Sequence, residues 1–445
     1  MKKITALIFL LVLLTLSLAS CKKSDEGETV FTGETKTLNV YNWGEYISDG
    51  SLGTLDSNAA FEEYFNKNLA SKYGFYIKVN YTTYATNEDM FSKLKSNAGT
   101  YDIVVPSDYM IEQMINEDML LSFDVSELSN YKYIDDEFKG MYYDPENRYS
   151  VPYTYGMTGV IYNKEFVDPE DYEKESWELL WNEKYKGKIL QFNNPRDAFA
   201  TAMYALGLDI NSKDEAVWQA ARDKLAQQKP LVQGYVNDEI FNKMTTASAA
   251  IATYYAGDYI TMAAQYDALG FYYPTEGTNY FVDAMCIPKN ARYPEVAKEY
   301  INFMLSEEAA VANALYIGYA SPNTLVKNSE SYREEMGEDA YEILYGVSPD
   351  TINAQYNEKY GTACYRSLVM LGMQDYVNTL WESLKTENST ELWVHISSGI
   401  IVFGVLSYAI YNIYIKKKRS RHYRYRDRDA AREKLLQKEG KRISN

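Results

Sequence analysis

Hydrophobic and polar positions follow one another in blocks that predict alternating strands and helices. Residues 38–43 are strand-like, and residues 58–74 have the apolar spacing of a helix that stops at its glycine. Residues 75–84 alternate as a strand, and residues 87–99 form a short helix that also ends at a glycine. Residues 101–107 carry a continuous β-branched run, as buried parallel strands do. This order predicts an α/β domain.

A second cycle of strands and helices begins at residues 150–165, and a further strand follows near residue 285. The segment between the predicted signal peptide and the C-terminal hydrophobic segment is long for a single hydrophobic core, so two lobes are expected. We expect the chain to cross between them near residues 150–157 and 272–285. The predicted domain covers 38–385, with lobe 1 at about 38–152 and 283–330, lobe 2 at about 153–282, and C-terminal helices up to 385.

The first 21 residues predict an export signal. Lys2 and Lys3 precede a short apolar run, and Leu-Ala-Ser leads into Cys21, an ending that resembles a bacterial lipobox. Cys21 would then be lipidated, although an ordinary signal peptide with an incidental cysteine is the alternative. The polar residues 22–37 are interpreted as a linker.

A second hydrophobic segment, residues 392–415, predicts a transmembrane helix near the C-terminus. A helix of that length would be about 36 Å long, enough to cross a bilayer. The basic tail that follows, residues 416–445, marks the cytoplasmic side. The alternative is a buried core helix, for which such a dense basic run would be an odd neighbour. The two ends together predict a domain outside the cytoplasm, tethered to the cell membrane at both ends.

Charge and composition narrow the possible partners and chemistry. The tail has 13 Lys/Arg against four Asp/Glu, and without it and the two signal lysines the chain carries −28. Such a domain repels nucleic acid and favours cationic partners. The two histidines of the whole chain, His395 and His422, lie in the predicted span and the tail, so the domain has none, which excludes His-based triads and His-containing zinc sites from it. Cys286 and Cys364 could form a single bridge or stay free. No cofactor, metal site or catalytic residue is predicted.

Several short stretches combine an acid with an aromatic residue. In the first, Trp43, Glu45 and Tyr46 follow a strand, and an acid with aromatic rings is suited to a cationic ligand. Ordinary packing of the rings, with a solvated Glu45, is the alternative. Ser107 and Tyr109 come directly after a buried strand, where α/β folds place their ligand crevice.

Three aspartates differ in how well a structural role explains them. Asp283 lies in an apolar strand, two residues after Phe281 and on the same face, so its carboxylate needs a partner or a cavity. Tyr255 precedes Asp258 by three residues, and Asp258 could cap a helix that starts at Tyr259. Asp197 lies in a predicted first helical turn, where support of the helix start explains it as well as ligand binding does.

These stretches resemble the spermidine/putrescine-binding proteins of ABC transporters. The resemblance covers residues 37–385 and rests on "YNWGEY", "YDIVVPSDYM", "YSVPYTYGMTGVIYN", "YAGDY", "DAMCIPKNA", "INFML" and "IGYASPN", in that order. It implies a two-lobed periplasmic-binding-protein fold of type II with a hinge, a linear polyamine as ligand, and ABC transporter permease subunits as partners. It implies these ligand contacts: Trp43, Glu45, Tyr46, Ser107, Tyr109, Asp197, Tyr255, Asp258, Phe281, Asp283 and Tyr319.

Departures from the family pattern leave the preferred amine open. Gly44 replaces a hydroxyl residue, Asn194 stands where spermidine binders can carry an acid, and Tyr255 and Phe281 replace tryptophans. The main hypothesis is a non-enzymatic protein that delivers polyamines to a transporter. The alternative is a receptor that senses polyamines and signals through a partner, which neighbouring permease or kinase genes would distinguish. An extracellular hydrolase is disfavoured, because a nucleophile motif and histidine are both missing.

Overall fold

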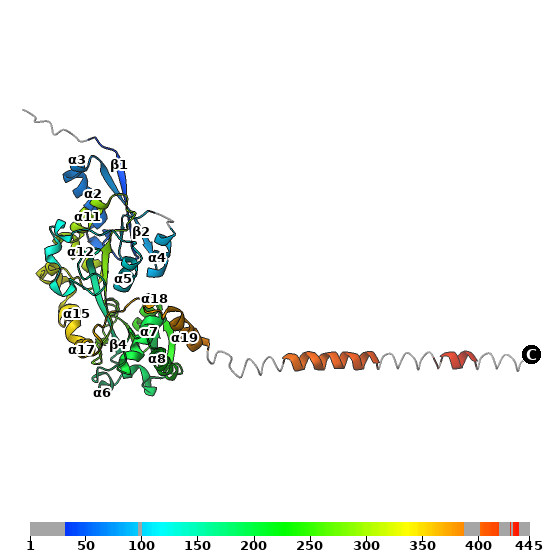
Figure 1. Cartoon of the computed structure of the whole chain (residues 1–445). Coiled ribbons are helices and arrows are strands. Elements are labelled where there is room, and N and C mark those ends of the chain that lie inside the picture. Colours follow the sequence, from blue (N-terminus) through cyan, green and yellow to red (C-terminus); the bar gives the residue numbers. More distant parts are fainter. Residues whose placement is uncertain (1–31, 97–99, 387–400, 418–427, 429, 436–445) are drawn as a thin grey trace, which may run out of the picture. The chain divides into compact units, whose positions relative to one another are not determined.

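The computed structural model describes residues 32–96, 100–386, 401–417, 428 and 430–435. The chain forms two compact units, residues 1–377 and 378–445. Cys21 and the first part of the expected linker lie outside the described residues. Figure 1 shows the chain coloured along its sequence.

The first unit is built on one mixed sheet of nine strands. Its strand order is β2-β1-β3-β9-β4-β7-β5-β6, and β8 pairs with β4. β1 pairs in parallel with β2 and β3, whereas β9 is antiparallel to both β3 and β4. The strands are β1 Thr35–Trp43, β2 Tyr76–Tyr84, β3 Ile103–Val104, β4 Ser150–Asn163, β5 Ile189–Phe192, β6 Val232–Val236, β7 Ile251–Tyr255, β8 Leu269–Tyr272 and β9 Tyr280–Cys286.

Helices alternate with these strands and then dominate the C-terminal third of the first unit. They are α2 Ser57–Asn68, α3 Ala70–Tyr73, α4 Asn87–Lys95, α5 Asp108–Asn116, α6 Pro169–Tyr172, α7 Pro195–Ala205, α8 Glu215–Gln228, α9 Glu239–Thr245, α10 Ala256–Ala263, α11 Pro294–Met304, α12 Glu307–Ile317, α13 Thr324–Lys327, α14 Glu330–Met336, α15 Glu338–Tyr345, α16 Pro349–Ile352, α17 Ala354–Tyr360, α18 Leu368–Leu371 and α19 Gln374–Thr386, the last of which crosses the boundary between the units.

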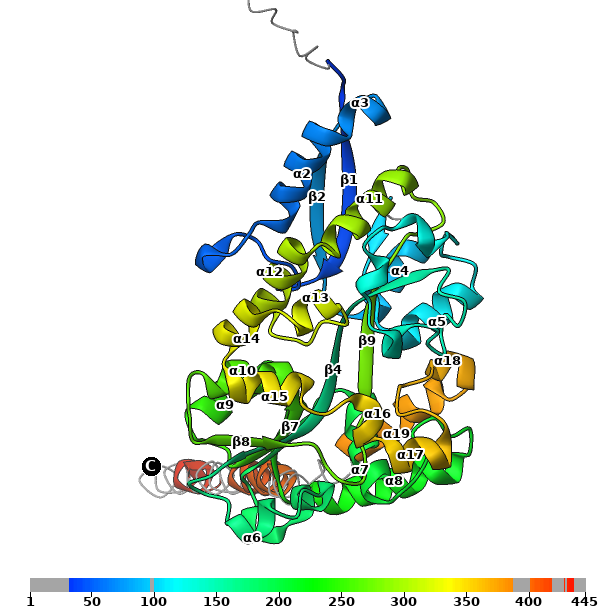
Figure 2. The ribbon, with the colours of Figure 1, turned by 90° about the vertical axis from the view of Figure 1, so that its left-hand side faces the viewer.

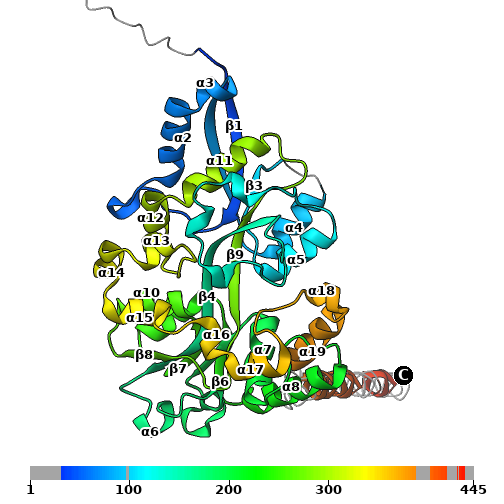
Figure 3. The same ribbon diagram turned by 60° about the vertical axis from the view of Figure 1, so that its left-hand side comes forward.

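β4 and β9 connect the two halves of the sheet. The N-terminal part of β4 pairs with β9, which pairs in turn with β3. The C-terminal part of β4, Thr158–Asn163, pairs with β7 and β8. Helices α2, α4 and α5 contact the first half, and α7, α9 and α10 contact the second. Figures 2 and 3 show β4 and β9 passing between the two halves.

The predicted order of elements in the first 105 residues is confirmed, with shifted ends. β1 begins at Thr35, so the expected linker is shorter than 22–37. The helix expected over residues 58–74 is divided into α2 and α3, and it stops where Gly74 adopts a left-handed conformation with φ 82°. Glycine has no Cβ to oppose that conformation, which explains the stop.

The second unit contains a helix over residues 401–417. Its large apolar side chains are exposed: Ile401, Val402, Phe403, Val405, Leu406, Tyr408, Ile410, Tyr411, Ile413 and Tyr414. Among the described residues, no helix has both the length and the apolar character needed to cross a membrane. Residues 392–400 of the span expected at 392–415 lie outside the described residues.

Candidate functional site

Asp283 is the most informative acid, because it lies in the middle of β9 with only 4% of its surface exposed. Tyr46 donates a hydrogen bond to its Oδ2 (2.5 Å), and the Tyr46 hydroxyl lies 2.7 Å from Thr154 Oγ1 on β4. The other oxygen, Oδ1, is buried without a hydrogen-bond partner. Burial raises the pKa of Asp283 to about 6. A buried carboxylate with an unused acceptor is costly unless a donor arrives.

Asp258 forms a second hydroxyl–carboxylate pair. Helix α10 begins at Ala256 and not at Tyr259, so Asp258 lies in its first turn and caps nothing. Its Oδ2 accepts a hydrogen bond from the Tyr319 hydroxyl (2.7 Å), and burial raises the pKa of Asp258 to about 6. The ring of Tyr319 packs directly over Gly257, where a Cβ would lie 2.2 Å from its Cδ1.

Asp197 is the third acid of the site and is buried, in the first turn of α7. Asn194 caps the helix, because its side chain accepts a hydrogen bond from the backbone N–H of Arg196. Asp197 is therefore not the N-cap residue of α7. Its Oδ2 accepts from the Tyr255 hydroxyl (2.8 Å) and its Oδ1 from the Tyr365 hydroxyl (2.9 Å). Burial raises the pKa of Asp197, and the two hydroxyl hydrogen bonds oppose that rise.

Aromatic contacts join the three acids into one site. The Tyr46 and Tyr319 rings lie 6.0 Å apart between centroids, and Phe281 contacts both Tyr319 (5.8 Å) and Tyr255 (5.6 Å). We call this set the tyrosine–aspartate cluster: Tyr46, Thr154, Asp197, Tyr255, Asp258, Phe281, Asp283, Tyr319 and Tyr365. Carboxylates beside aromatic faces attract cations, and an ammonium group can use both.

Four of the expected contacts lie outside this cluster. Glu45 is exposed and accepts a hydrogen bond from Tyr316 (2.8 Å), and the Trp43 indole donates to the Val105 carbonyl (3.0 Å). Asn87 donates to the hydroxyls of both Ser107 (3.1 Å) and Tyr109 (2.9 Å). Of the four, Ser107 is the nearest to the cluster, because its backbone forms an antiparallel bridge with Asp283.

Thr154 and Tyr365 belong to the cluster, although no sequence pattern predicts either of them. Thr154 is opposite Asp283 in the register of β4 and β9, past an irregularity at residues 152–154. Tyr365 follows Cys364, far along the chain from Asp197. Cys286 and Cys364 do not form a disulfide bond with each other, and both are buried free thiols.

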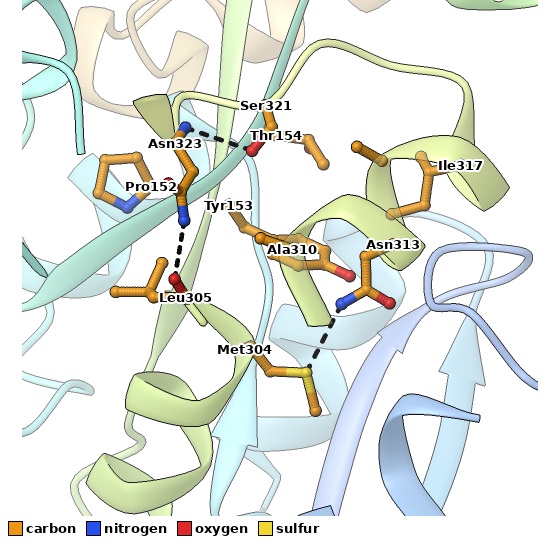
Figure 4. Close-up of a pocket in the computed structure, with 11 residues that line it drawn as sticks. Pro152, Tyr153, Thr154, Met304, Leu305, Ala310, Asn313, Ile317, Ser321 and Asn323 are labelled. Carbon is orange, nitrogen blue, oxygen red and sulfur yellow. Dashed lines mark hydrogen bonds between the residues drawn. The ribbon is translucent and has the colours of Figure 1, made fainter. Parts of the chain in front are cut away.

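A small cavity lies next to the cluster, between β4 and α12, and Figure 4 shows its lining. Thr154 contributes to the cavity wall, together with Tyr153, Asn313 and mainly apolar side chains. Its free volume is about 10 Å³, which admits one water molecule at most. The cavity is too small for a linear amine. The candidate ligand site is the tyrosine–aspartate cluster, because its carboxylates lie beside aromatic rings.

The chain matches a known family of bacterial proteins. Residues 59–337 match the bacterial extracellular solute-binding protein family. The spermidine/putrescine-binding periplasmic protein of Escherichia coli (strain K12) is 32% identical over 331 residues, which are 74% of this chain and 89% of that protein. Its counterpart in Salmonella typhimurium is 34% identical over 291 residues, which are 65% of this chain and 78% of that protein.

A solved structure supports the same assignment. The spermidine/putrescine ABC transporter substrate-binding protein from Streptococcus pneumoniae shares 30% identity and superimposes with a TM-score of 0.63. The match covers 78% of this chain and 99% of that one. The fold is therefore a mixed α/β periplasmic-binding-protein fold, and the chain is a non-enzymatic solute-binding protein. Within that class it belongs to the spermidine/putrescine-binding proteins of ABC transporters.

Proposed function

We propose that this protein captures a polyamine outside the cytoplasm and delivers it to the membrane subunits of an ABC transporter. The observation that carries the proposal is Asp283, a buried carboxylate whose Oδ1 has no partner within a cluster of tyrosines. An ammonium group supplies the missing donor and the missing charge together, and it is attracted by the rings of Tyr46 and Tyr319.

The physical basis is a change in the protonation of Asp258 and Asp283 when the ligand binds. The pKa values of Asp258 and Asp283 are raised to about 6 by burial, so an approaching ammonium group stabilises their ionised forms. Phe281, between Tyr255 and Tyr319, offers an apolar surface to the methylene groups between the nitrogens. Trp43, Glu45, Ser107 and Tyr109 are proposed as further contacts at the edge of the cluster.

Two lobes with the bounds expected from the sequence, joined at a hinge, are part of the proposal. The long β4 supports this division, since its two ends pair with different halves of the sheet. Ligand should slow amide hydrogen exchange around Thr154 and Phe281 in the full-length protein. Unchanged exchange in both strands at saturating ligand would contradict closure over the ligand.

Substitution of Asp283 tests the ligand directly. Asp283→Asn keeps the shape but turns a charge-assisted hydrogen bond into a neutral one, a loss of roughly 1.5–3 kcal/mol or about 10- to 150-fold in affinity. The measurement is calorimetric titration of the detergent-solubilised full-length protein with putrescine, cadaverine and spermidine. Asp136→Asn, at a side chain that is 95% exposed, is the matched control and should bind as the unaltered protein does. Absence of heat with every polyamine in the unaltered protein would refute the proposed function.

Anchoring at both ends is also proposed, by lipid at Cys21 and by a membrane span over residues 392–415. It is supported by the apolar character of that segment and by the basic residues that follow it. A tag placed after Asn445 should then resist protease added to intact cells and become sensitive after the membrane is opened. Removal of the tag from intact cells would place the C-terminus outside and contradict the topology.

A further inference from the structure

Arg196 places a positive charge at the Asp197 end of the cluster. Its Nη2 donates hydrogen bonds to the side chain of Asn211 (2.8 Å) and to the Arg366 carbonyl (3.2 Å), which are both neutral acceptors. Its guanidinium carbon lies 4.5 Å from the ring centroid of Tyr365, and Tyr365 donates to Asp197. Among the residues that the structure describes, no carboxylate forms an ion pair with Arg196, and its Nη1 is buried without a partner.

The three acids are not equally available to a ligand. Both oxygens of Asp197 already accept hydroxyl hydrogen bonds, from Tyr255 and Tyr365. Asp258 and Asp283 each use a single oxygen in hydroxyl hydrogen bonds, and the second oxygen of Asp283 has no partner. Two carboxylates of the cluster are therefore open to new donors, while the third is satisfied and stands beside a cation.

We propose that Arg196 is a specificity-determining residue, which offsets the charge of Asp197 and thereby restricts the ligand to amines with two ammonium groups. The inference rests on the proposed function and deepens it. With all three aspartates ionised, the cluster and Arg196 together carry a charge of −2, which a diamine neutralises; Glu45, the acid proposed as a contact at the edge of the cluster, is exposed, so solvent screens its charge. A triamine leaves an excess positive charge in a desolvated site and brings an ammonium group towards Arg196, where like-charge repulsion is strong.

Paired titrations of a diamine and a triamine test this selection. In the detergent-solubilised full-length protein, we expect putrescine to bind on the order of tenfold tighter than spermidine. Arg196→Gln removes the charge and keeps a donor for the Asn211 side chain. This variant should bind spermidine on the order of tenfold tighter than before and putrescine within a few-fold of its original affinity. Arg196→Lys restores the charge and should restore the preference for putrescine.

A matched control separates this effect from general loss of charge. Arg148→Gln alters an arginine whose side chain is 57% exposed and should leave the ratio of the two affinities unchanged. Melting temperatures of all variants report on folding, and the ratio of affinities within one variant is independent of the fraction folded. Equal binding of spermidine and putrescine by the unaltered protein, or an unchanged ratio in Arg196→Gln, would overturn the inference while polyamine binding stands. If the unaltered protein bound neither amine, the proposed function would fail and the inference with it.

Discussion

At the scale of single residues, burial and hydroxyl partners decide what each aspartate can do. Asp197 is held by two tyrosines, whereas Asp283 has an oxygen without any partner. Burial raises the pKa of Asp283 and of Asp258, because the surrounding protein disfavours their charged forms. A cation beside either acid would therefore lower its pKa and favour its ionised form.

These pKa values predict opposite effects of pH on stability and on binding. The folded protein holds protons on Asp258 and Asp283 up to about pH 6, whereas the unfolded chain releases them near pH 4. The contribution of these groups to stability is therefore full below pH 4 and is lost as the pH rises to 6. Amine affinity should instead increase on the order of tenfold or more between pH 5 and pH 7.5, because binding needs both carboxylates ionised.

Titrations of putrescine at four pH values, with melting curves of the unliganded protein at the same values, check this expectation. Asp283→Asn should weaken the pH dependence of binding, since it removes one of the two titrating groups. An affinity that is the same at pH 5 and pH 7.5 would contradict the role of these acids.

Individual side chains were predictable where their own neighbours in sequence set the chemistry. Asp283 was expected to need a partner because it lies in an apolar strand, and Tyr46 was expected nearby because of its family motif. Thr154 and Tyr365 were not expected, because the first depends on strand register past an irregularity and the second on a segment distant in the chain. Glu45 is predicted as a contact of the cationic ligand, with a solvated side chain as the alternative; in the structure it is exposed and accepts a hydrogen bond from Tyr316.

At the scale of elements, glycines allow the aromatic side chains of the cluster to pack against backbone. A Cβ on Gly257 in α10 would lie 2.2 Å from Tyr319 Cδ1 and 2.8 Å from the Gly318 carbonyl oxygen. On β4, a Cβ at Gly156 would lie 2.7 Å from Phe281 Cζ. Contacts this short are repulsive, so the rings can occupy these places only above glycine.

Gly257→Ala should therefore displace Tyr319 and separate its hydroxyl from Asp258. Overpacking of this kind costs about 1–3 kcal/mol of stability, and we expect amine affinity to fall on the order of tenfold. Melting curves and titration with putrescine measure both effects. Gly234→Ala in β6 is the control, because a Cβ there meets nothing within 4 Å. Unchanged affinity in Gly257→Ala would show that Tyr319 has no part in binding.

The order of elements followed from the hydrophobic pattern, but their pairing did not. The parallel arrangement around β1 agrees with the buried β-branched run. The antiparallel insertion of β9 between β3 and β4 depends on contacts across more than 120 residues, which no local pattern contains. The start of α10 was predicted three residues late, because its N-cap residue, Tyr255, makes no side-chain capping bond that the sequence could reveal.

At the scale of the whole ligand-binding unit, residues 364–367 connect parts that lie far apart in the sequence. Glu112 on α5 accepts hydrogen bonds from Arg366 Nε (2.7 Å) and from the backbone of Ser367 (3.0 Å). On the other side, Asn211 accepts from the backbone of Arg366 (2.8 Å) and donates to the Cys364 carbonyl (2.9 Å). Tyr365 lies between these ties, so the contact of its hydroxyl with Asp197 depends on both.

Loss of the hydrogen bonds between Glu112 and residues 366–367 should therefore weaken ligand binding, although Glu112 is not part of the cluster. Glu112→Gln removes the negative charge that accepts hydrogen bonds from Arg366 and Ser367. The new amide NH₂ group is itself a donor and cannot accept from these two residues. Hydrogen bonds to charged groups contribute roughly 1.5–3 kcal/mol, so we expect the melting temperature to fall on the order of 5 °C. Affinity for putrescine should fall several-fold, because Tyr365 is held less firmly against Asp197. Glu63→Gln, at an exposed position on α2, is the control and should change neither quantity. A Glu112→Gln protein that melts earlier but binds putrescine unchanged would restrict these ties to stability and separate them from the ligand site.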